Sequence, residues 1–491
     1  MPATLRTGTA LYASALLLDR LLGLLLLPLL TRAIDPHDYG AWTQTAVAAG
    51  LLMPVVLLAT PTAIVRSFSA AVGASPRLHF FGRLGGLALL LFLVIAAFVL
   101  AWREPFARLV YGETGRAVIV PALLAVLAAD AAVDFATAWL RAGGRMGLIS
   151  AVLAWRSALR YGVVLWLVGE GGVALADWLG TYAAVQCMLA LAVLVVTLAL
   201  LRRGVEPAGA AVSTVAVPRL RDLLSFCLPL VALAIFTSFS ATFDRFLLVH
   251  LLGLDAVAVY AAAVSLCGVP ALFYTVLGFT LFPVLARHWG AGRRDEAARL
   301  STQALLVFAF LCLPVALTLA LAGPALLPLL STADYRAEPQ VFALLGLSVT
   351  AFGCYQILLY ALLLDGRSRQ VLALAVGAAA LNAALNLLLA PRWGAAGAAA
   401  AAAATHVAMV VWAARLAGRA MPWRLPWARL GRIALHALAA AVPLAAALWP
   451  FPATPAVSWP LVSAAVLLGG LLYVALDWGR SGSVARMLLA K

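Results

Sequence analysis

Eight charged side chains interrupt the apolar stretches of this sequence, and they are the residues best placed to do chemistry. They are four aspartates and four arginines, in the pairs Asp19 and Arg20, Asp130 and Asp134, Arg156 and Arg160, and Asp244 and Arg245. Each costs roughly 2.5–3.5 kcal/mol at the centre of a membrane helix, so we expect them to have a use. The sequence has no phosphate-binding glycine loop, nucleophile elbow or HExxH motif, and its histidines and cysteines show no ligand spacing. These observations predict a binding or transport site without enzyme activity, metal or cofactor.

The most specific pattern joins two predicted neighbouring helices. Asp130 and Asp134 are four residues apart, as are Arg156 and Arg160, so each pair lies on one helix face. Counting from the short turn 141–147 predicts that Asp134 meets Arg156 and that Asp130 meets Arg160. Two main interpretations stay open: the pairs only neutralise buried charge, or they form a cavity wall whose arginines bind an anionic ligand. Alternatively, Arg156 lies close enough to its helix end to extend toward the membrane surface.

Other polar residues inside the apolar stretches are candidates for coupling or binding. Asp19 with Arg20 and Asp244 with Arg245 are pairs of adjacent residues. Adjacent helix residues point about 100° apart, so the two members cannot face the same partner. One member of a pair is a candidate for coupling transport to an ion or proton gradient. Asn382 and Asn386 form a polar stripe that either lines the cavity or hydrogen-bonds to another helix.

The elements that must hold these residues are membrane helices. Of the 491 residues, 65% are hydrophobic and 11% are charged, whereas about a quarter of a soluble domain is charged. Apolar runs recur along the chain, each long enough to cross a ~30 Å hydrocarbon core as a helix. The sequence therefore predicts an all-α integral membrane protein with about fourteen transmembrane helices. The expected spans are 11–31, 41–65, 84–102, 117–140, 147–168, 177–200, 223–251, 256–284, 301–322, 340–363, 370–390, 395–415, 433–452 and 459–478.

The distribution of basic residues predicts the orientation of these helices. Of the 34 Lys and Arg residues, 24 fall on one side of the predicted membrane, six on the other and four within the spans. An excess of this kind is typical of cytoplasmic loops. We therefore expect a multi-pass protein of the cytoplasmic (inner or plasma) membrane with both termini in the cytoplasm. The same distribution accounts for the net charge of +15 without nucleic acid as a partner.

The longest weakly hydrophobic stretch, 203–220, contains two prolines and two glycines and divides the predicted helices into groups. The expected parts are a six-helix lobe at 1–205, a cytoplasmic linker at 206–222, a second six-helix lobe at 223–420, and a terminal helix pair with a cytoplasmic tail at 421–491. A weak internal repeat supports the two lobes, since Leu30–Trp42 is similar to Leu248–Tyr260 at an offset of 218. An even number of helices in each lobe predicts parallel lobes related by an axis along the membrane normal. At the related offset of 222, Asn382 falls opposite Arg160.

Five short motifs occur in a fixed order along the chain. They are Pro28–Gly40, Leu140–Arg145, Leu228–Leu230, Asp244–Leu248 and Asn386–Ala398. This ordered set, over roughly residues 5–420, resembles the polysaccharide-transporter branch of the multidrug/oligosaccharidyl-lipid/polysaccharide flippase superfamily. That branch contains the Wzx-type exporters of lipid-linked O-antigen or exopolysaccharide repeat units.

The resemblance implies a fold, a cargo and a set of partners. It implies two six-helix lobes around a central cleft, alternating access, and an undecaprenyl-diphosphate-linked oligosaccharide as substrate. Family members bind the diphosphate through cationic cavity residues, a role that Arg156 and Arg160 fit by position. Membrane lipids and the polysaccharide polymerase and export machinery are the implied partners.

Alternative functions stay open at this stage. Fourteen helices exceed the twelve often found in this branch, which brings the lipid II flippase, a sister family with two more helices, into consideration. A multidrug cation antiporter of the same superfamily would need an acid-dominated cavity, whereas here aspartates and arginines balance. A membrane glycosyltransferase or ligase would need a large external loop, and none is predicted. A membrane scaffold would not explain the buried charges.

Overall fold

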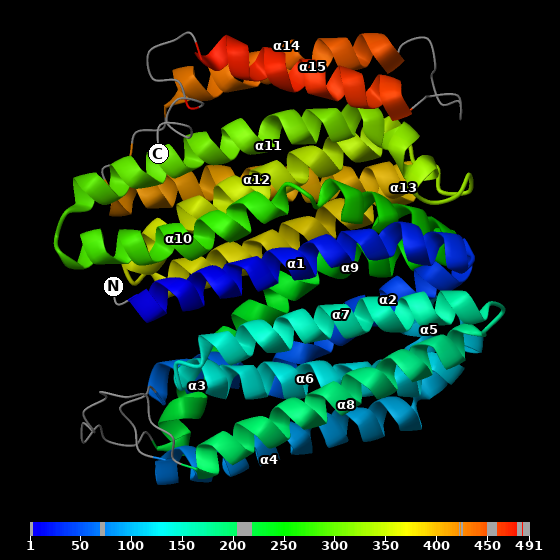
Figure 1. Ribbon diagram of the computed structural model, residues 1–491, viewed down its shortest axis with the longest axis vertical. Helices are drawn as coiled ribbons and strands as arrows, with labels where there is room; N and C mark the ends of the chain where they lie inside the picture. Colours follow the sequence, from blue (N-terminus) through cyan, green and yellow to red (C-terminus); the bar gives the residue numbers. More distant parts are fainter. Residues whose placement is uncertain are drawn as a thin grey trace. The chain divides into compact units, whose positions relative to one another are not determined.

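The computed structural model describes residues 3–68, 74–203, 219–421, 423, 426–448, 459–478 and 484. Within these ranges all regular secondary structure is helical. By its internal packing the chain divides into two compact units, Met1–Asp255 (unit 1) and Ala256–Lys491 (unit 2). Figure 1 shows long helices running side by side within each unit. Helices suit a membrane because each satisfies its own backbone hydrogen bonds.

Unit 1 is built from apolar helices whose ends are set by proline, glycine and capping residues. Pro36 opens α2 behind Asp35, whose carboxylate accepts a hydrogen bond from the Asp38 amide at 2.8 Å. The bounds are α1 Ala3–Ala33, α2 Pro36–Leu57, α3 Thr60–Ser67, α4 Ala74–Ala101, α5 Arg103–Tyr111, the 3-10 helix η1 Thr114–Ile119, α6 Val120–Ala142, α7 Met146–Glu170, α8 Leu175–Arg202 and the first part of α9 Leu220–Cys267.

Unit 2 contains the end of α9 and six further helices. Several are long and contain prolines, of which α11 has three, at positions 314, 324 and 328. The bounds are α10 Ala271–Gly290, α11 Arg294–Leu330, α12 Pro339–Leu364, α13 Ser368–Ala420, α14 Trp427–Leu448 and α15 Trp459–Trp478.

Twelve helices within the described ranges are long and apolar enough to cross a membrane. The 53-residue α13 would be about 80 Å long if straight, more than twice the hydrocarbon core, and Gly394 interrupts it in the middle. Gly253 likewise interrupts α9, whose last turns lead into α10. Counting both halves of α13 and adding the shorter apolar helix α15 reaches the predicted fourteen crossings. The prediction of an all-α, multi-pass membrane protein is therefore confirmed.

The compact units divide at a different place from the predicted lobes. Of the predicted linker 206–222, residues 206–218 lie outside the described residues, and the two compact units meet at Asp255 and Ala256. The part of α9 that belongs to unit 1 comes into backbone contact with α2 beside its Gly253 bend. A Cβ added to Gly40 of α2 would collide with the main-chain carbonyl of Leu254. Which segments move as lobes stays a prediction.

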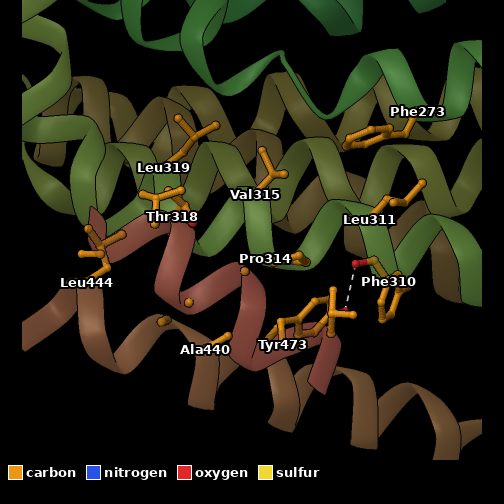
Figure 2. Close-up of a pocket in the computed structure, with 17 residues that line it drawn as sticks. Phe273, Phe310, Leu311, Pro314, Val315, Thr318, Leu319, Ala440, Leu444 and Tyr473 are labelled. Carbon is orange, nitrogen blue, oxygen red and sulfur yellow. Dashed lines mark hydrogen bonds between the residues drawn. The ribbon is translucent and has the colours of Figure 1, made fainter. Parts of the chain in front are cut away.

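The terminal helices α14 and α15 pack against α11 in unit 2 through one well-defined contact. Pro314 has no amide hydrogen, so the carbonyl of Phe310, one turn before it, lacks its usual helical donor. The hydroxyl of Tyr473 on α15 donates to this carbonyl at 2.9 Å, and the two aromatic rings stack with centroids 4.6 Å apart. Figure 2 shows this bond beside Pro314, at the edge of an apolar cavity of about 480 Å³ between α11, α14 and α15.

This contact yields a first prediction. Tyr473→Phe should lower the free energy of unfolding by about 0.6–1.5 kcal/mol, because the Phe310 carbonyl loses its donor inside an apolar layer. Pro314→Ala restores the helical amide, so Tyr473→Phe should cost less in that background. Unfolding of the purified variants in detergent measures both costs. Tyr360→Phe is the matched control, since the described residues offer its hydroxyl no hydrogen-bond partner. Equal costs in the two backgrounds would contradict this role of Tyr473.

Candidate functional site

The charged residues of α6 and α7 form an ion pair, one turn away from the predicted register. Arg156 Nη2 donates to Asp130 Oδ1 at 2.8 Å, and the two side chains are only 18% and 24% exposed. The predicted pairing of Asp134 with Arg156 is therefore wrong, although Asp134 still lies within electrostatic range of Arg156. Counted from the end of α6 at Ala142 and the start of α7 at Met146, Asp134, Arg156 and Asp130 lie about 12, 15 and 18 Å from the turn. Arg156 is therefore midway in depth between the two carboxylates, and depth alone does not select its partner.

Arg160, one turn further along α7, has a different partner from the predicted one. Its guanidinium interacts with the hydroxyl of Tyr182 on α8, and Asp130 and Asp19 are its charged neighbours. No direct ion pair with Asp130 occurs among the described residues, so the second predicted pairing is also wrong. The Nε atoms of Arg156 and Arg160 are both buried and have no hydrogen-bond partner in the described part of the chain. Each arginine therefore keeps donor capacity that another acceptor can use.

Helix α1 contributes a third carboxylate to the same place. Asp19 Oδ1 accepts a hydrogen bond from the hydroxyl of Ser157 on α7 at 2.6 Å. Arg20, the next residue, is exposed, which agrees with the expectation that the two cannot share a partner. We call Asp19, Asp130, Asp134, Arg156 and Arg160 the charged cluster. It holds three carboxylates and two guanidinium groups, and it lies wholly within unit 1.

The remaining predicted residues lie elsewhere. Asp244 is buried on α9 and accepts a hydrogen bond from the backbone amide of Arg245 at 2.8 Å. The side chain of Arg245 lies within electrostatic range of Tyr39 on α2. In unit 2, Asn386 Nδ2 donates to Asn382 Oδ1 at 3.0 Å, and both side chains are buried on α13. The asparagines therefore bond to each other along one helix face.

Sequence reasoning missed the neutral partners of the charged cluster and one polar pair in unit 2. Ser157 and Tyr182 have no spacing that singles them out, because their partners lie on other helices. In unit 2, His406 Nδ1 of α13 lies 2.8 Å from the hydroxyl of Ser348 on α12, and its ring packs 4.9 Å from that of Phe352. A histidine near the middle of an apolar run was the available signal for this pair.

Two family models match the sequence. The family described as "Polysaccharide biosynthesis protein" matches residues 5–289, and the family described as "Lipid II flippase MurJ" matches residues 164–464. No curated protein matches the sequence significantly.

Solved structures share the fold at low sequence identity. A lipid II flippase MurJ in an inward closed conformation is 12% identical, with a TM-score of 0.75 over 98% of this chain and 100% of that one. An inward-facing multidrug resistance MATE family transporter is 14% identical, with a TM-score of 0.61 over 82% and 95%. A MOP superfamily transporter from Pyrococcus furiosus is 12% identical, with a TM-score of 0.59 over 85% and 96%.

Each family model spans more than half of the chain, and the two overlap across α7 to α10. The structural likeness extends from the first helix to the terminal pair. The chain therefore belongs to the MOP superfamily of membrane flippases and transporters, in the part of it described by the polysaccharide biosynthesis protein and MurJ families.

Proposed function

We propose that this protein is a flippase that moves undecaprenyl-diphosphate-linked oligosaccharide repeat units across the cytoplasmic membrane, for the synthesis of O-antigen or exopolysaccharide. The observation that carries the proposal is the charged cluster, where two arginines of α7 lie one turn apart inside an apolar layer. The match to polysaccharide biosynthesis proteins supports the cargo.

The chemistry of a diphosphate suits these arginines. A diphosphate is excluded from lipid by its charge, so its path needs fixed positive groups in a hydrated cleft. Arginine offers a planar fork of donors and stays charged at every physiological pH. In the charged cluster Asp130 holds Arg156. An entering phosphate would take the place of this carboxylate and also bind the Nε atoms that have no partner in the described residues.

This exchange of partners provides a route to coupling. When the phosphate binds Arg156, Asp130 is left without its counter-ion, and an isolated carboxylate in an apolar layer is stabilised by taking up a proton. Asp19, held by Ser157, is the second carboxylate that can respond in this way. Asp244 and Arg245 remain candidates for the same role, as does Arg20. Asn382 and Asn386 remain candidate contacts for the sugar.

We further propose alternating access between lobes 1–205 and 223–420, with both termini in the cytoplasm. The 24-to-six distribution of basic residues supports this orientation. Only the diphosphate and the oligosaccharide need to enter the cleft, because the prenyl chain is soluble in the bilayer. The apolar cavity between α11 and the terminal pair is a surface where part of such a chain can lie.

Deletion of the gene tests the proposed function. The surface or secreted polysaccharide should disappear and its lipid-linked precursor should accumulate on the cytoplasmic side, as measured by mass spectrometry of extracted lipids. Arg160→Ala should fail to restore export, and so should the double variant Asp130→Ala, Arg156→Ala, which leaves neither member of the ion pair alone. Arg103→Ala, an exposed arginine at the start of α5, is the matched control and should restore export. Normal polysaccharide in a deletion strain without a paralogue would falsify the proposal.

A second candidate function is the flipping of lipid II. The likeness to a lipid II flippase covers 98% of this chain, including the terminal pair, whereas that to the MATE family transporter covers 82%. Both cargoes carry a diphosphate, so the charged cluster suits either one. Accumulation of the peptidoglycan precursor, with loss of viability and normal polysaccharide, would identify lipid II as the cargo. Increased sensitivity to cationic drugs alone would identify an antiporter.

A further inference from the structure

The end of unit 1 that carries the α1–α2 turn contains a histidine between two carboxylates. His37, at the start of α2, has its Nε2 atom 3.1 Å from Glu113 Oε1 and its Nδ1 atom 3.4 Å from Asp255 Oδ1. Glu113 lies between α5 and η1, and Asp255 lies on α9 two residues after Gly253. One imidazole ring therefore links three segments that are far apart in the sequence.

A second histidine at the same end of unit 1 makes a similar pair of contacts. His250, three residues before Gly253, has its Nδ1 atom 2.7 Å from the carbonyl of Phe246 and its Nε2 atom 3.1 Å from the carbonyl of Arg108 on α5. It therefore joins α9 to α5. The two histidines thus hold α9 on the two sides of its bend at Gly253, His250 before it and His37 through Asp255 after it.

Both nitrogens of each ring face oxygen atoms that accept hydrogen bonds. Carboxylate and carbonyl oxygens only accept hydrogen bonds, and a neutral imidazole carries only one N–H. Both ring nitrogens of each histidine face an acceptor, so a second N–H is needed to satisfy all four contacts. An imidazolium supplies it, and histidine acquires this charge in the physiological range of pH.

The charged groups around the His37 ring are arranged as follows: Glu113 and Asp255 face the ring, and Arg116 pairs with Glu113 and with Asp38. Against His250 lies the main-chain carbonyl of Arg108. Burial alone would raise the pKa of Glu113, but hydrogen bonds from His37 and Arg116 outweigh it and hold that pKa below its ordinary value. Glu113 thus stays ionised over the range in which a histidine titrates. Arg116 Nε donates to the same Glu113 oxygen at 2.9 Å, so the carboxylate is fixed in place.

The bend between the two histidines is a specific backbone feature. Gly253 has φ 84° and ψ 179°, a conformation that essentially only glycine adopts. Leu254, the next residue, touches Gly40 of α2 through its carbonyl. The contacts of His37 and His250 therefore hold α9 against α2 and α5 on both sides of this bend.

We propose that His37 and His250 form a proton-dependent latch that holds the outer end of α9 against α2 and α5, strengthened by acid outside the cell. The proposal rests on the proposed transport function, in which this end must open, and on the orientation that places it outside. Protonation adds the missing N–H to each ring and closes the latch. Deprotonation leaves one nitrogen of each ring without a proton, so that its lone pair faces the partner's oxygen, and the latch loosens.

Hydrogen exchange of the purified protein in nanodiscs tests the latch without any substrate. Amides in 104–113 and 247–257 should exchange at least about tenfold more slowly at pH 5.5 than at pH 8, after matching for intrinsic amide exchange, because the charge-assisted hydrogen bonds resist opening. His37→Gln combined with His250→Gln should remove this difference. His79→Gln is the matched control, an exposed histidine on α4, and it should retain the difference.

Two further variants test the latch in case the double glutamine variant fails to fold. Glu113→Gln keeps both histidines and should weaken only the His37 half, which reduces the pH effect. His37→Lys keeps a charge at both pH values and should give protection at pH 8 as well. A pH effect in the double glutamine variant equal to wild type, or none in wild type, would overturn the latch. A latch that persists while the deletion strain exports polysaccharide normally would overturn the transport function alone.

Discussion

Arg156→Ala is expected to destabilise unit 1 by about 3 kcal/mol, because it leaves Asp130 as an uncompensated charge in an apolar environment. Fully buried pairs cost roughly 3–5 kcal/mol when one partner is removed. The lower end applies here, since both side chains retain about a fifth of their exposure. The double variant Asp130→Ala, Arg156→Ala should recover most of the loss, because no unpaired charge remains.

Unfolding of the four proteins of this double-mutant cycle in detergent measures the coupling between Asp130 and Arg156. Asp134→Ala is a useful comparison, as Asp134 is exposed and makes no ion pair among the described residues. It should cost far less than Asp130→Ala. Additive costs for Asp130→Ala and Arg156→Ala, with no recovery in the double variant, would show that the pair contributes no coupling energy.

The second large effect is expected at Gly40. Gly40→Val should prevent stable folding of unit 1, with a loss of about 3 kcal/mol or more, because its side chain meets the main chain of Leu254. A flexible side chain would move aside, but here the obstacle is backbone on a helix that His37 and His250 also hold. Gly40→Ala should also destabilise unit 1, with a smaller loss of free energy than Gly40→Val.

Gly50→Ala, ten residues along the same helix, provides the matched control. Nothing lies within 4 Å of a Cβ added at Gly50. The substitution should therefore stabilise α2 by about 0.5–1 kcal/mol, since alanine is the better helix former. Yield of monodisperse protein and the temperature of unfolding in detergent distinguish the two positions. Similar behaviour of Gly40→Ala and Gly50→Ala would contradict the close contact of α2 with α9.

Sequence patterns were sufficient to predict the membrane helices and to predict that the charged residues of α6 and α7 lie close together. Apolar runs identify membrane helices because lipid leaves no other way to satisfy the backbone. The short turn between α6 and α7 made their charges comparable in depth, which correctly placed Asp130, Asp134, Arg156 and Arg160 in one neighbourhood. The register was wrong by one turn because Arg156 lies midway in depth between Asp134 and Asp130, so its partner depends on how the two helices pack, which spacing does not give.

The other partners could not be predicted because they come from distant parts of the chain. Ser157 bonds to a residue 138 positions away and His37 to one 76 positions away. No spacing rule reaches that far, since such pairs depend on how helices pack. The same reason applies to the contact of α9 with α2 in unit 1. The backbones of Gly40 and Leu254 approach each other closely, and the presence of a glycine at position 40 does not by itself predict which segment it contacts.

The hydrogen bond between Asp19 and Ser157 has a consequence for biosynthesis. The 138 residues between the two take about 7–28 s to synthesise at about 5–20 residues per second. During that interval α1 has emerged from the ribosome with a carboxylate whose partner on α7 does not yet exist. We expect α1 to stay beside the translocation channel, or to carry a proton on Asp19, until α7 has been made. Helix α1 therefore completes its packing in unit 1 only after α7 has been made.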